Sequence, residues 1–294
     1  MLTLLYPLNA LLMMALPMAL GVWLARKAQA PWRLFGIGAV TFIGSQAVHL
    51  PLNAGLTALF KIIWPSPQPQ WWHIPFNAVV LGLTAGMCEE LARYIGYRWL
   101  ARKARAVRDA LMLGAGHGGT EAIILGGLVA LGFVNMVILR DMDLTKLGLT
   151  GNLLTQTQNQ VAAYWGAPWA MALMGAIERL LAIPVQVSLA VLVLQVFTRG
   201  DGRWLVVAIG YHLSVDALAV VGVYSNWPPL IVEATLVPFT LVSLFIILRL
   251  RPSGIPLTLS EPELILVSGA SDTPRLASNR VADARRQLED SKFA

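Results

Sequence analysis

Three apolar segments of the sequence carry ionisable side chains at helical spacing, and the first of them contains Glu89, Glu90 and Arg93. Residues three or four apart are neighbours on a helix, so one arginine can partly neutralise both carboxylates. A charged group inside a membrane-spanning helix costs on the order of 3 kcal/mol, so each of these residues needs a reason to be there. A structural ion pair that locks helix packing and a reactive site are both open explanations.

Two histidine–carboxylate pairs follow, each with a four-residue spacing. His117 and Glu121 lie in a glycine-rich segment, and His212 and Asp216 lie in a later apolar segment. Side chains four apart share one side of a helix, which is how two metal ligands or an acid–base pair are presented together. A lone histidine in such a segment is more often a hydrogen-bonded packing residue. Two such pairs beside a double glutamate favour a site.

These side chains include the groups that hydrolysis requires. A carboxylate can deprotonate water, and a cation or hydrogen-bond donor can stabilise the oxyanion that forms. A zinc ion could activate the water instead, held by the two histidines and a carboxylate. The candidate ligands for such a zinc ion are His117, His212, Glu121 and Asp216. Both mechanisms stay open at this stage, and the pairing of histidines with orienting carboxylates slightly favours zinc.

The composition indicates which elements must position these residues. Of the 294 residues, 56% are hydrophobic and 13% are charged, which leaves too little polar surface for a soluble protein. Apolar runs exceed the roughly 20 residues of helix that cross a bilayer core. They predict an all-α, polytopic bundle of about seven transmembrane spans. These are residues 3–24, 34–60, 74–100, 109–139, 168–197, 203–223 and 228–249.

Basic residues lie mainly in alternate connections between the predicted spans. Arg26, Arg102, Arg199 and Arg251 are examples from the four connections in which they gather. The positive-inside rule therefore predicts an N-terminus outside the cell and a C-terminus in the cytoplasm. The same placement explains the net charge of +6 better than nucleic-acid binding does. We expect an integral membrane protein, in the plasma membrane, with no nucleic-acid partner.

Two segments differ in composition from these spans. Residues 140–167 contain the run Thr-Gln-Thr-Gln-Asn-Gln and are predicted to be an outer loop on the bilayer surface. From Pro252 onward, the chain is rich in Ser, Pro and charged residues. The predicted organisation is a bundle over residues 1–251 followed by a polar, disordered cytoplasmic tail over residues 252–294.

Depth in the membrane places the unusual residues at one level. Glu89, His117 and His212 each lie nine residues from an arginine at the predicted cytoplasmic end of their span. At a rise of 1.5 Å per residue this is about 14 Å, close to the middle of a core roughly 30 Å thick. Glu121 and Asp216 form a second layer just beyond. We therefore expect these residues to converge.

Two glycine pairs flank these residues. Gly82 and Gly86, like Gly114 and Gly118, have the small-xxx-small spacing that permits close helix approach. No strand–turn–helix pattern surrounds the second pair, which argues against a dinucleotide site. We expect the third and fourth spans to pack tightly against each other.

The ordered set of motifs resembles that of the YhfC-type intramembrane metalloproteases. These are relatives of the CAAX-prenyl endopeptidase and bacteriocin-processing (CPBP) membrane proteases and of the PrsW proteases. The resemblance covers nearly all of the membrane region, and the ordered set is more specific than any single motif. It rests on Glu-Glu-x-x-Arg at 89–93, Gly-x-Gly-His-Gly-Gly-x-Glu-Ala at 114–122, Glu-Arg at 178–179 and His-x-x-x-Asp at 212–216.

The resemblance implies peptide-bond hydrolysis within the bilayer, on a membrane protein or peptide substrate. By the family pattern, Glu89 is the general base that activates water. Glu90 and Arg93 shape the charge of that base.

The resemblance also implies roles for the histidines. His117 helps to position water or metal, and His212 with Asp216 holds the scissile carbonyl or a metal. One departure concerns the fifth span, where the family often carries a histidine and this chain has Gln186. If that position is a ligand, this chain binds metal weakly or works without it.

Other classes of function use the same residue types. Buried Glu, His and Asp also form ion relays, so a proton-coupled transporter or channel is the main alternative. The absence of internal repeats and the common depth of the residues argue against it. A catalytically silent scaffold that binds a partner helix is a third interpretation.

Overall fold

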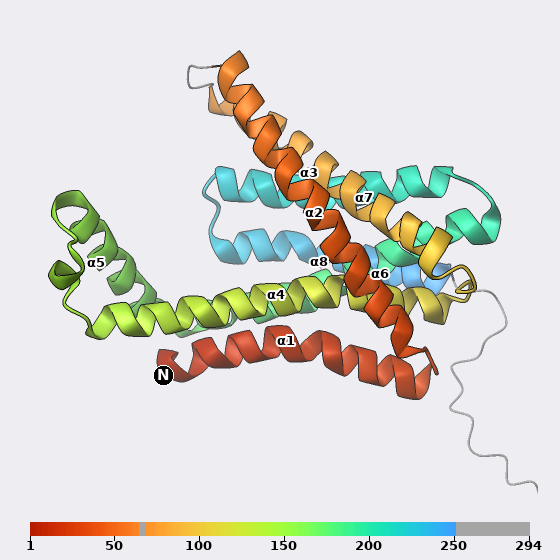
Figure 1. Cartoon of the computed structure of the whole chain (residues 1–294), viewed down its shortest axis with the longest axis horizontal. Coiled ribbons are helices and arrows are strands. Elements are labelled where there is room, and N and C mark those ends of the chain that lie inside the picture. The colour runs from red at the N-terminus through yellow and green to blue at the C-terminus, as the bar shows by residue number, and fades with distance from the viewer. Residues whose placement is uncertain (65–68, 251–294) are drawn as a thin grey trace, which may run out of the picture. The chain divides into compact units, whose positions relative to one another are not determined.

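The structure is a computed structural model that describes residues 1–64 and 69–250. These residues form helices, with no strand among them (Figure 1). The predicted tail, residues 252–294, lies outside the described residues. The α-helices are α1 (Leu2–Lys27), α2 (Trp32–Ile63), α3 (Gln70–Ile95), α4 (Val107–Asp141), α5 (Gly151–Trp165), α6 (Met174–Arg199), α7 (Arg203–Tyr224) and α8 (Pro229–Arg249). A π-helical turn, Gly96–Leu100, continues α3, and 3-10 turns occupy Leu144–Leu147 and Trp169–Leu173.

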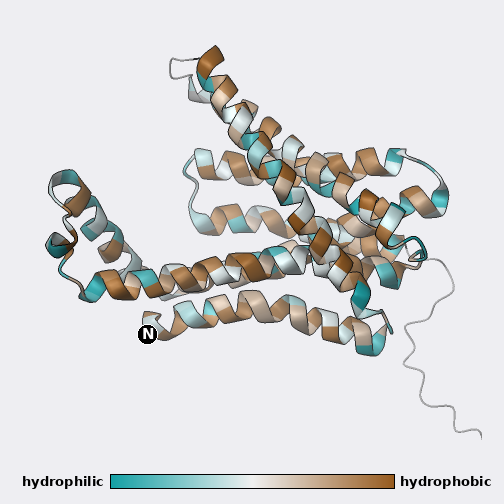
Figure 2. Cartoon of the chain, viewed as in Figure 1, coloured by the Kyte–Doolittle hydropathy of each residue, from teal (hydrophilic) through white to brown (hydrophobic). Residues whose placement is uncertain are grey.

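Six helices, counted over the described residues, are long and apolar enough to cross a membrane. They are α1, α2, α4, α6 with the 3-10 turn before it, α7 and α8, and Figure 2 shows hydrophobic residues along them. The remaining predicted span, α3, has 26 residues and carries Glu89, Glu90 and Arg93. The predicted all-α membrane bundle is confirmed. The number of crossings and the orientation stay predictions.

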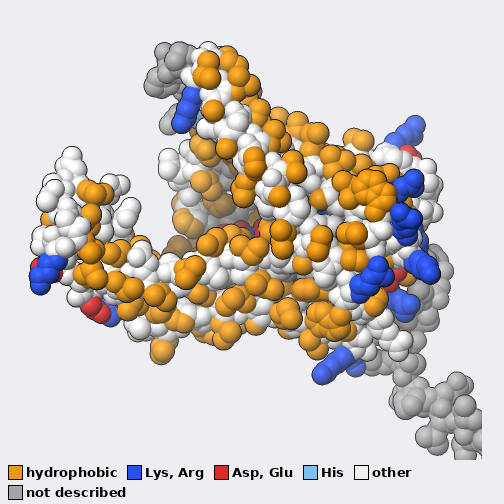
Figure 3. Space-filling view, viewed as in Figure 1, with side chains coloured by type: hydrophobic (Ala, Val, Ile, Leu, Met, Phe, Trp, Pro, Cys, Tyr) orange, Lys and Arg blue, Asp and Glu red, His pale blue; other side chains and the backbone are white. Residues whose placement is uncertain are grey.

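The outer surface of the helices is apolar. Hydrophobic side chains cover most of the face in Figure 3, and Lys and Arg gather mainly at one end. Large side chains such as Val40, Leu131 and Phe245 are more than half exposed. A surface of this kind is unfavourable in water and is what a helical bundle presents to lipid.

Close packing of α2 on α4 depends on two glycines. A Cβ atom added to Gly38 would lie 2.1 Å from the backbone oxygen of Leu113, and one added to Gly116 would lie 2.1 Å from that of Phe35. Side chains cannot be accommodated at such distances, so the two backbones touch where the helices cross. α1 and α6 also pack against α4, while α3 packs along α7 and α6 along α8.

The predicted packing of the third span against the fourth was wrong. Gly82 and Gly86 face α7, because a Cβ on Gly86 would lie 2.9 Å from a backbone oxygen of that helix. Gly114 and Gly118 face α6, where a Cβ on Gly118 would lie 2.6 Å from the Cβ of Gln186. The spacing of small residues predicts a close approach, but it does not identify the partner helix.

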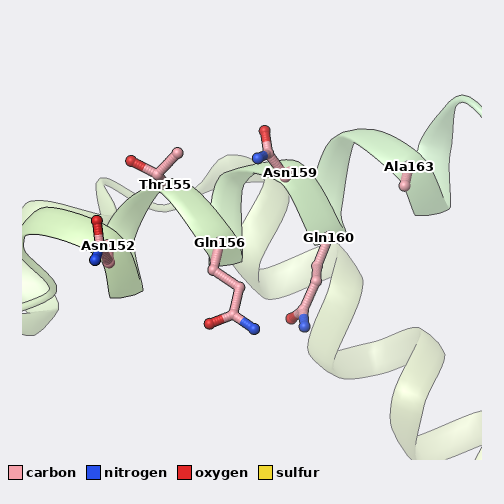
Figure 4. Close-up of a pocket in the computed structure, with 6 residues that line it drawn as sticks. All are labelled: Asn152, Thr155, Gln156, Asn159, Gln160 and Ala163. Carbon is pink, nitrogen blue, oxygen red and sulfur yellow. The ribbon is translucent and has the colours of Figure 1, made fainter.

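The segment 140–167, predicted to be a loop, contains the helix α5. Residues of α5 that lie three or four positions apart, most of them polar, share one face (Figure 4). That face consists of Asn152, Thr155, Gln156, Asn159 and Gln160, with Ala163.

Tertiary contacts hold the end of α5. The Trp165 Nε1 donates to the backbone oxygen of Met136 on α4 at 3.2 Å, and the Tyr6 hydroxyl on α1 donates to that of Tyr164 at 2.7 Å. Asn and Thr have a low intrinsic helix propensity, so these contacts favour the helix where those residues do not. The position of α5 on the bilayer surface stays a prediction.

Candidate active site

Three helices bring Glu89, His117 and His212 together. The Oε2 atom of Glu89, on α3, lies 3.1 Å from Nε2 of His117 on α4. It lies 3.9 Å from Nε2 of His212 on α7. All three residues are buried, with at most 6% of their surface exposed. The convergence expected from their common depth is therefore present in the structure.

Arg93 and Glu90 complete the centre of this cluster, and both are buried. Arg93 forms an ion pair with Glu90 and lies 3.6 Å from Oε2 of Glu89. The Oε1 atom of Glu90 lies 2.7 Å from Nδ1 of His212. One guanidinium thus faces both carboxylates, as their spacing predicts, and these contacts compensate the cost of burying the charges.

Asp216 lies between the buried cluster and a more exposed side of the bundle. Its Oδ2 atom lies 3.5 Å from Nε2 of His212, and 35% of its side chain is exposed. Figure 3 shows acidic side-chain atoms at the floor of a hollow in the apolar surface. An acidic group is therefore accessible from a recess within the membrane-facing part of the bundle.

Glu121 does not join the histidines, although it lies one helical turn from His117. One of its oxygens accepts from the Arg179 guanidinium at 2.8 Å, and the other accepts from the Gln186 amide at 2.9 Å. Arg179 also pairs with Glu178. Glu121 therefore belongs to a neighbouring cluster with α6.

Gln186 links this neighbouring cluster to the first one. Its Oε1 accepts a hydrogen bond from Arg93, while its Nε2 donates to Glu121. The residue is 9% exposed, and the missing side chain of Gly118 provides its room. The amide uses its oxygen as an acceptor and its nitrogen as a donor. Gln186 therefore bridges the two clusters, which is a different role from that of a metal ligand.

Helix α2 supplies two contacts that the sequence analysis missed. Thr41 Oγ1 lies 2.9 Å from Nδ1 of His117, and Gln46 Nε2 donates to Oε1 of Glu89 at 3.1 Å. Threonine and glutamine are uncharged, and burying them costs less than burying a charge, so neither stands out in the sequence. The available signal was a polar stripe on an apolar span, at Thr41, Ser45, Gln46 and His49.

Comparison with known proteins agrees with the motifs. The family model described as YhfC intramembrane metalloprotease matches residues 12–235 of the chain, which include all of these side chains. The chain belongs to the YhfC family. An uncharacterized membrane protein YhfC from Bacillus subtilis (strain 168) is 29% identical over 210 residues, which is 70% of this chain and 79% of the relative. No solved structure gives a significant match.

In this YhfC-family protein, the surrounding groups orient both histidines. The Thr41 hydroxyl lies 2.7 Å from the Gly38 backbone oxygen. A carbonyl can only accept, so the hydroxyl donates to it and the Nδ1–H of His117 donates to Thr41. The Glu90 carboxylate likewise accepts from the Nδ1–H of His212. The Nε2 atoms of both imidazoles then face Oε2 of Glu89, and the 3.1 Å hydrogen bond between Nε2 of His117 and this oxygen requires a proton between the two atoms.

The family name implies a metal, and the donors can be tested against zinc. Across residues 1–64 and 69–250, no three His, Cys, Asp or Glu side chains are arranged as a ready-made metal site. Two imidazole Nε2 atoms beside carboxylates, each with its Nδ1 engaged, are nevertheless the kind of donors that zinc takes. Between two of the candidate ligands, the 3.5 Å from Nε2 of His212 to Oδ2 of Asp216 compares with roughly 3.3 Å between ligands around tetrahedral zinc. The donor atoms present are therefore of the kinds that bind zinc.

The contact of Thr41 with His117 leads to a prediction. Thr41→Val keeps the shape of the side chain but leaves the Nδ1–H of His117 without an acceptor. We expect cleavage of a membrane peptide to slow by about 10- to 100-fold, as for other groups that orient a functional histidine. Thr41→Ser should restore most of the rate.

The matched control is Thr235→Val on α8, where the hydroxyl donates to the Val232 backbone oxygen of its own helix. Rates measured across pH should show a changed profile for Thr41→Val alone. Equal rates in both valine variants, or no rescue by serine, would mean that Thr41 does not orient His117.

Proposed function

We propose that this YhfC-family protein is an intramembrane peptidase and that Glu89 is its general base. The observation that carries the proposal is the contact of this buried carboxylate with two histidines, at 3.1 and 3.9 Å, from two other helices. Membership of a family named for intramembrane proteolysis supports it. The apolar surroundings favour a membrane protein or peptide as the substrate.

The contacts of Glu89 divide its two oxygens between two tasks. Gln46 donates to Oε1 and so holds the carboxylate in place. Oε2, beside both histidines, is the atom that takes a proton from water. The resulting hydroxide attacks the peptide carbonyl carbon, and the proton held by Glu89 passes to the leaving amine as the C–N bond breaks. Arg93 offsets the charge of the two carboxylates throughout.

We propose zinc as the metal that the family name implies, held by His117, His212 and Asp216. Glu121 leaves the predicted ligand set because its oxygens bond Arg179 and Gln186. When bound, zinc polarises a water molecule so that it becomes a nucleophile at neutral pH, and it stabilises an oxyanion. The chain's own residues would orient the two imidazoles and accept the proton.

The polar side chains that connect the first cluster with α6 are poorly suited to a proton relay. From Glu90, hydrogen bonds and ion pairs run through Arg93 and Gln186 to Glu121, and then through Arg179 to Glu178. A guanidinium keeps its proton in proteins, and an amide does not titrate. A relay along this path would be interrupted at both arginines and at the amide.

New N-termini in membranes provide the test. Membranes from cells that express the full chain should contain peptides with new N-termini within or beside transmembrane segments, detected by mass spectrometry. A zinc chelator should suppress them. The proposal fails if membranes with and without the protein give the same N-termini while the purified protein in liposomes carries a pH-driven ion flux.

A further inference from the structure

A pocket outside the proposed active site lies where α3 gives way to the π-helical turn. Its volume is about 360 Å³, and its lining consists of Arg98, Trp99, Arg102 and Arg105. This volume falls within the range of small-ligand sites. π-helical turns are uncommon and frequently lie at functional sites. We propose that this pocket binds the phosphate of an anionic phospholipid headgroup.

The three arginines bring positive charge together at one pocket. Among the ion pairs of residues 1–64 and 69–250, none includes Arg98, Arg102 or Arg105. Asp109, the acidic residue that follows them in sequence, lies 3.9 Å from Arg108 instead. Three guanidiniums around one pocket repel one another, and an anion between them would offset that repulsion. Guanidinium groups also bind phosphate oxygens in a two-pronged manner.

Neighbouring helices hold this pocket in place. Arg105 donates to the backbone oxygen of Ala104 at 2.8 Å, and its guanidinium lies over the Phe197 ring of α6, 4.7 Å from the centroid. From α2, Arg33 donates to the backbone oxygen of Leu100 at 2.8 Å. One arginine and the end of the π-helical turn are thus fixed before any ligand binds, which lowers the entropic cost of binding.

The position of the pocket favours a lipid over a free anion. Lys and Arg gather mainly at the end of the molecule where the apolar surface stops (Figure 3), and lipid phosphates lie at such a boundary. Trp99, which lines the pocket, is 58% exposed, and tryptophan is enriched at the headgroup level. A headgroup phosphate would meet the arginines while the lipid's glycerol and chains meet this ring.

Native mass spectrometry of the purified full chain can test the site. The protein in detergent is titrated with phosphatidylglycerol or with phosphatidylcholine of the same acyl chains. We expect the anionic lipid to bind more tightly. The triple variant Arg98→Gln, Arg102→Gln, Arg105→Gln should weaken its binding on the order of 100-fold, since each basic residue contributes a several-fold factor.

The matched control removes the same charge at the ends of two other helices, with Arg26→Gln, Lys27→Gln and Arg249→Gln. It should change binding less than about threefold if the site is local, because these exposed residues do not line the pocket. If the triple variant does not fold, Arg102→Gln alone, at an exposed position, should weaken binding by about fivefold.

Three results would overturn the proposal. Equal weakening by the control would mean general charge attraction. Equal affinity for phosphatidylcholine, whose phosphate is neutralised by a cationic choline, would mean that the net negative charge of the headgroup is not what is recognised. Displacement of phosphatidylglycerol by millimolar inorganic phosphate would mean a site for free anions. None of these measurements depends on cleavage, so they are independent of the proposed peptidase.

Discussion

Replacing Glu89 with glutamine is expected to slow peptide cleavage by about 100- to 10,000-fold, the loss typical of removing a general base. The glutamine amide has the size of the carboxylate. Its oxygen can still accept a hydrogen bond from Nε2 of Gln46, which lies 3.1 Å from Oε1 of Glu89 in the structure. It cannot take a proton from water, so the chemical step loses its base while the helices keep their packing. The measurement is the rate of cleavage of a labelled peptide derived from a new N-terminus identified in membranes.

The control for this prediction is Glu233→Gln on α8, which removes a carboxylate outside the site. It should cleave at the wild-type rate. His117→Ala and His212→Ala should be as inactive as Glu89→Gln while the protein still inserts into the membrane. Should Glu89→Gln instead cleave normally and abolish a pH-dependent ion flux in liposomes, the carboxylate belongs to a proton relay and the peptidase proposal is wrong.

Replacing Gly38 with alanine is expected to lower the free energy of unfolding by about 1–3 kcal/mol or more, as overpacking does in other proteins. The added Cβ would lie 2.1 Å from one backbone atom of α4 and 2.6 Å from another, at Leu113 and His117. Backbone atoms cannot rotate away as a side chain can, so α2 must move off α4. That movement would also lengthen the contact of Thr41 with His117 and slow cleavage.

The matched control is Gly44→Ala on the same helix, where an added Cβ would meet no atom of residues 1–64 and 69–250 within 4 Å. Alanine is the better helix former by roughly 1 kcal/mol, so this variant should be at least as stable as the wild type. Thermal unfolding of the purified proteins in one detergent gives the comparison. Similar midpoints for the two variants would show that α2 and α4 do not meet as closely as the structure has them.

The membrane bundle and the central residues were predictable because they depend on properties along one helix. Helical spacing places Glu89, Glu90 and Arg93 within reach of one another. The rise per residue places His117 and His212 at the same depth as Glu89. Charges in an apolar span are costly enough to stand out in the sequence.

The partners of several residues depended instead on how the helices are rotated and which of them touch. Glu121 was predicted to act with His117, yet Arg179 and Gln186 on α6 bind both of its oxygens. Gly82 and Gly86 pack on α7 and not on α4. A carboxylate or a glycine is compatible with several neighbours, so its own helix does not specify which one it meets.

The sequence by itself thus determined the class of the protein, a helical membrane bundle, and the buried acid–histidine chemistry of its centre. The tertiary structure decided which oxygen and nitrogen atoms meet, and it added Thr41 and Gln46 from α2 to them. The physical reason is that periodicity and rise define face and depth within one helix. Rotation and neighbours are set by packing between helices, here by backbone contact at Gly38 and Gly116.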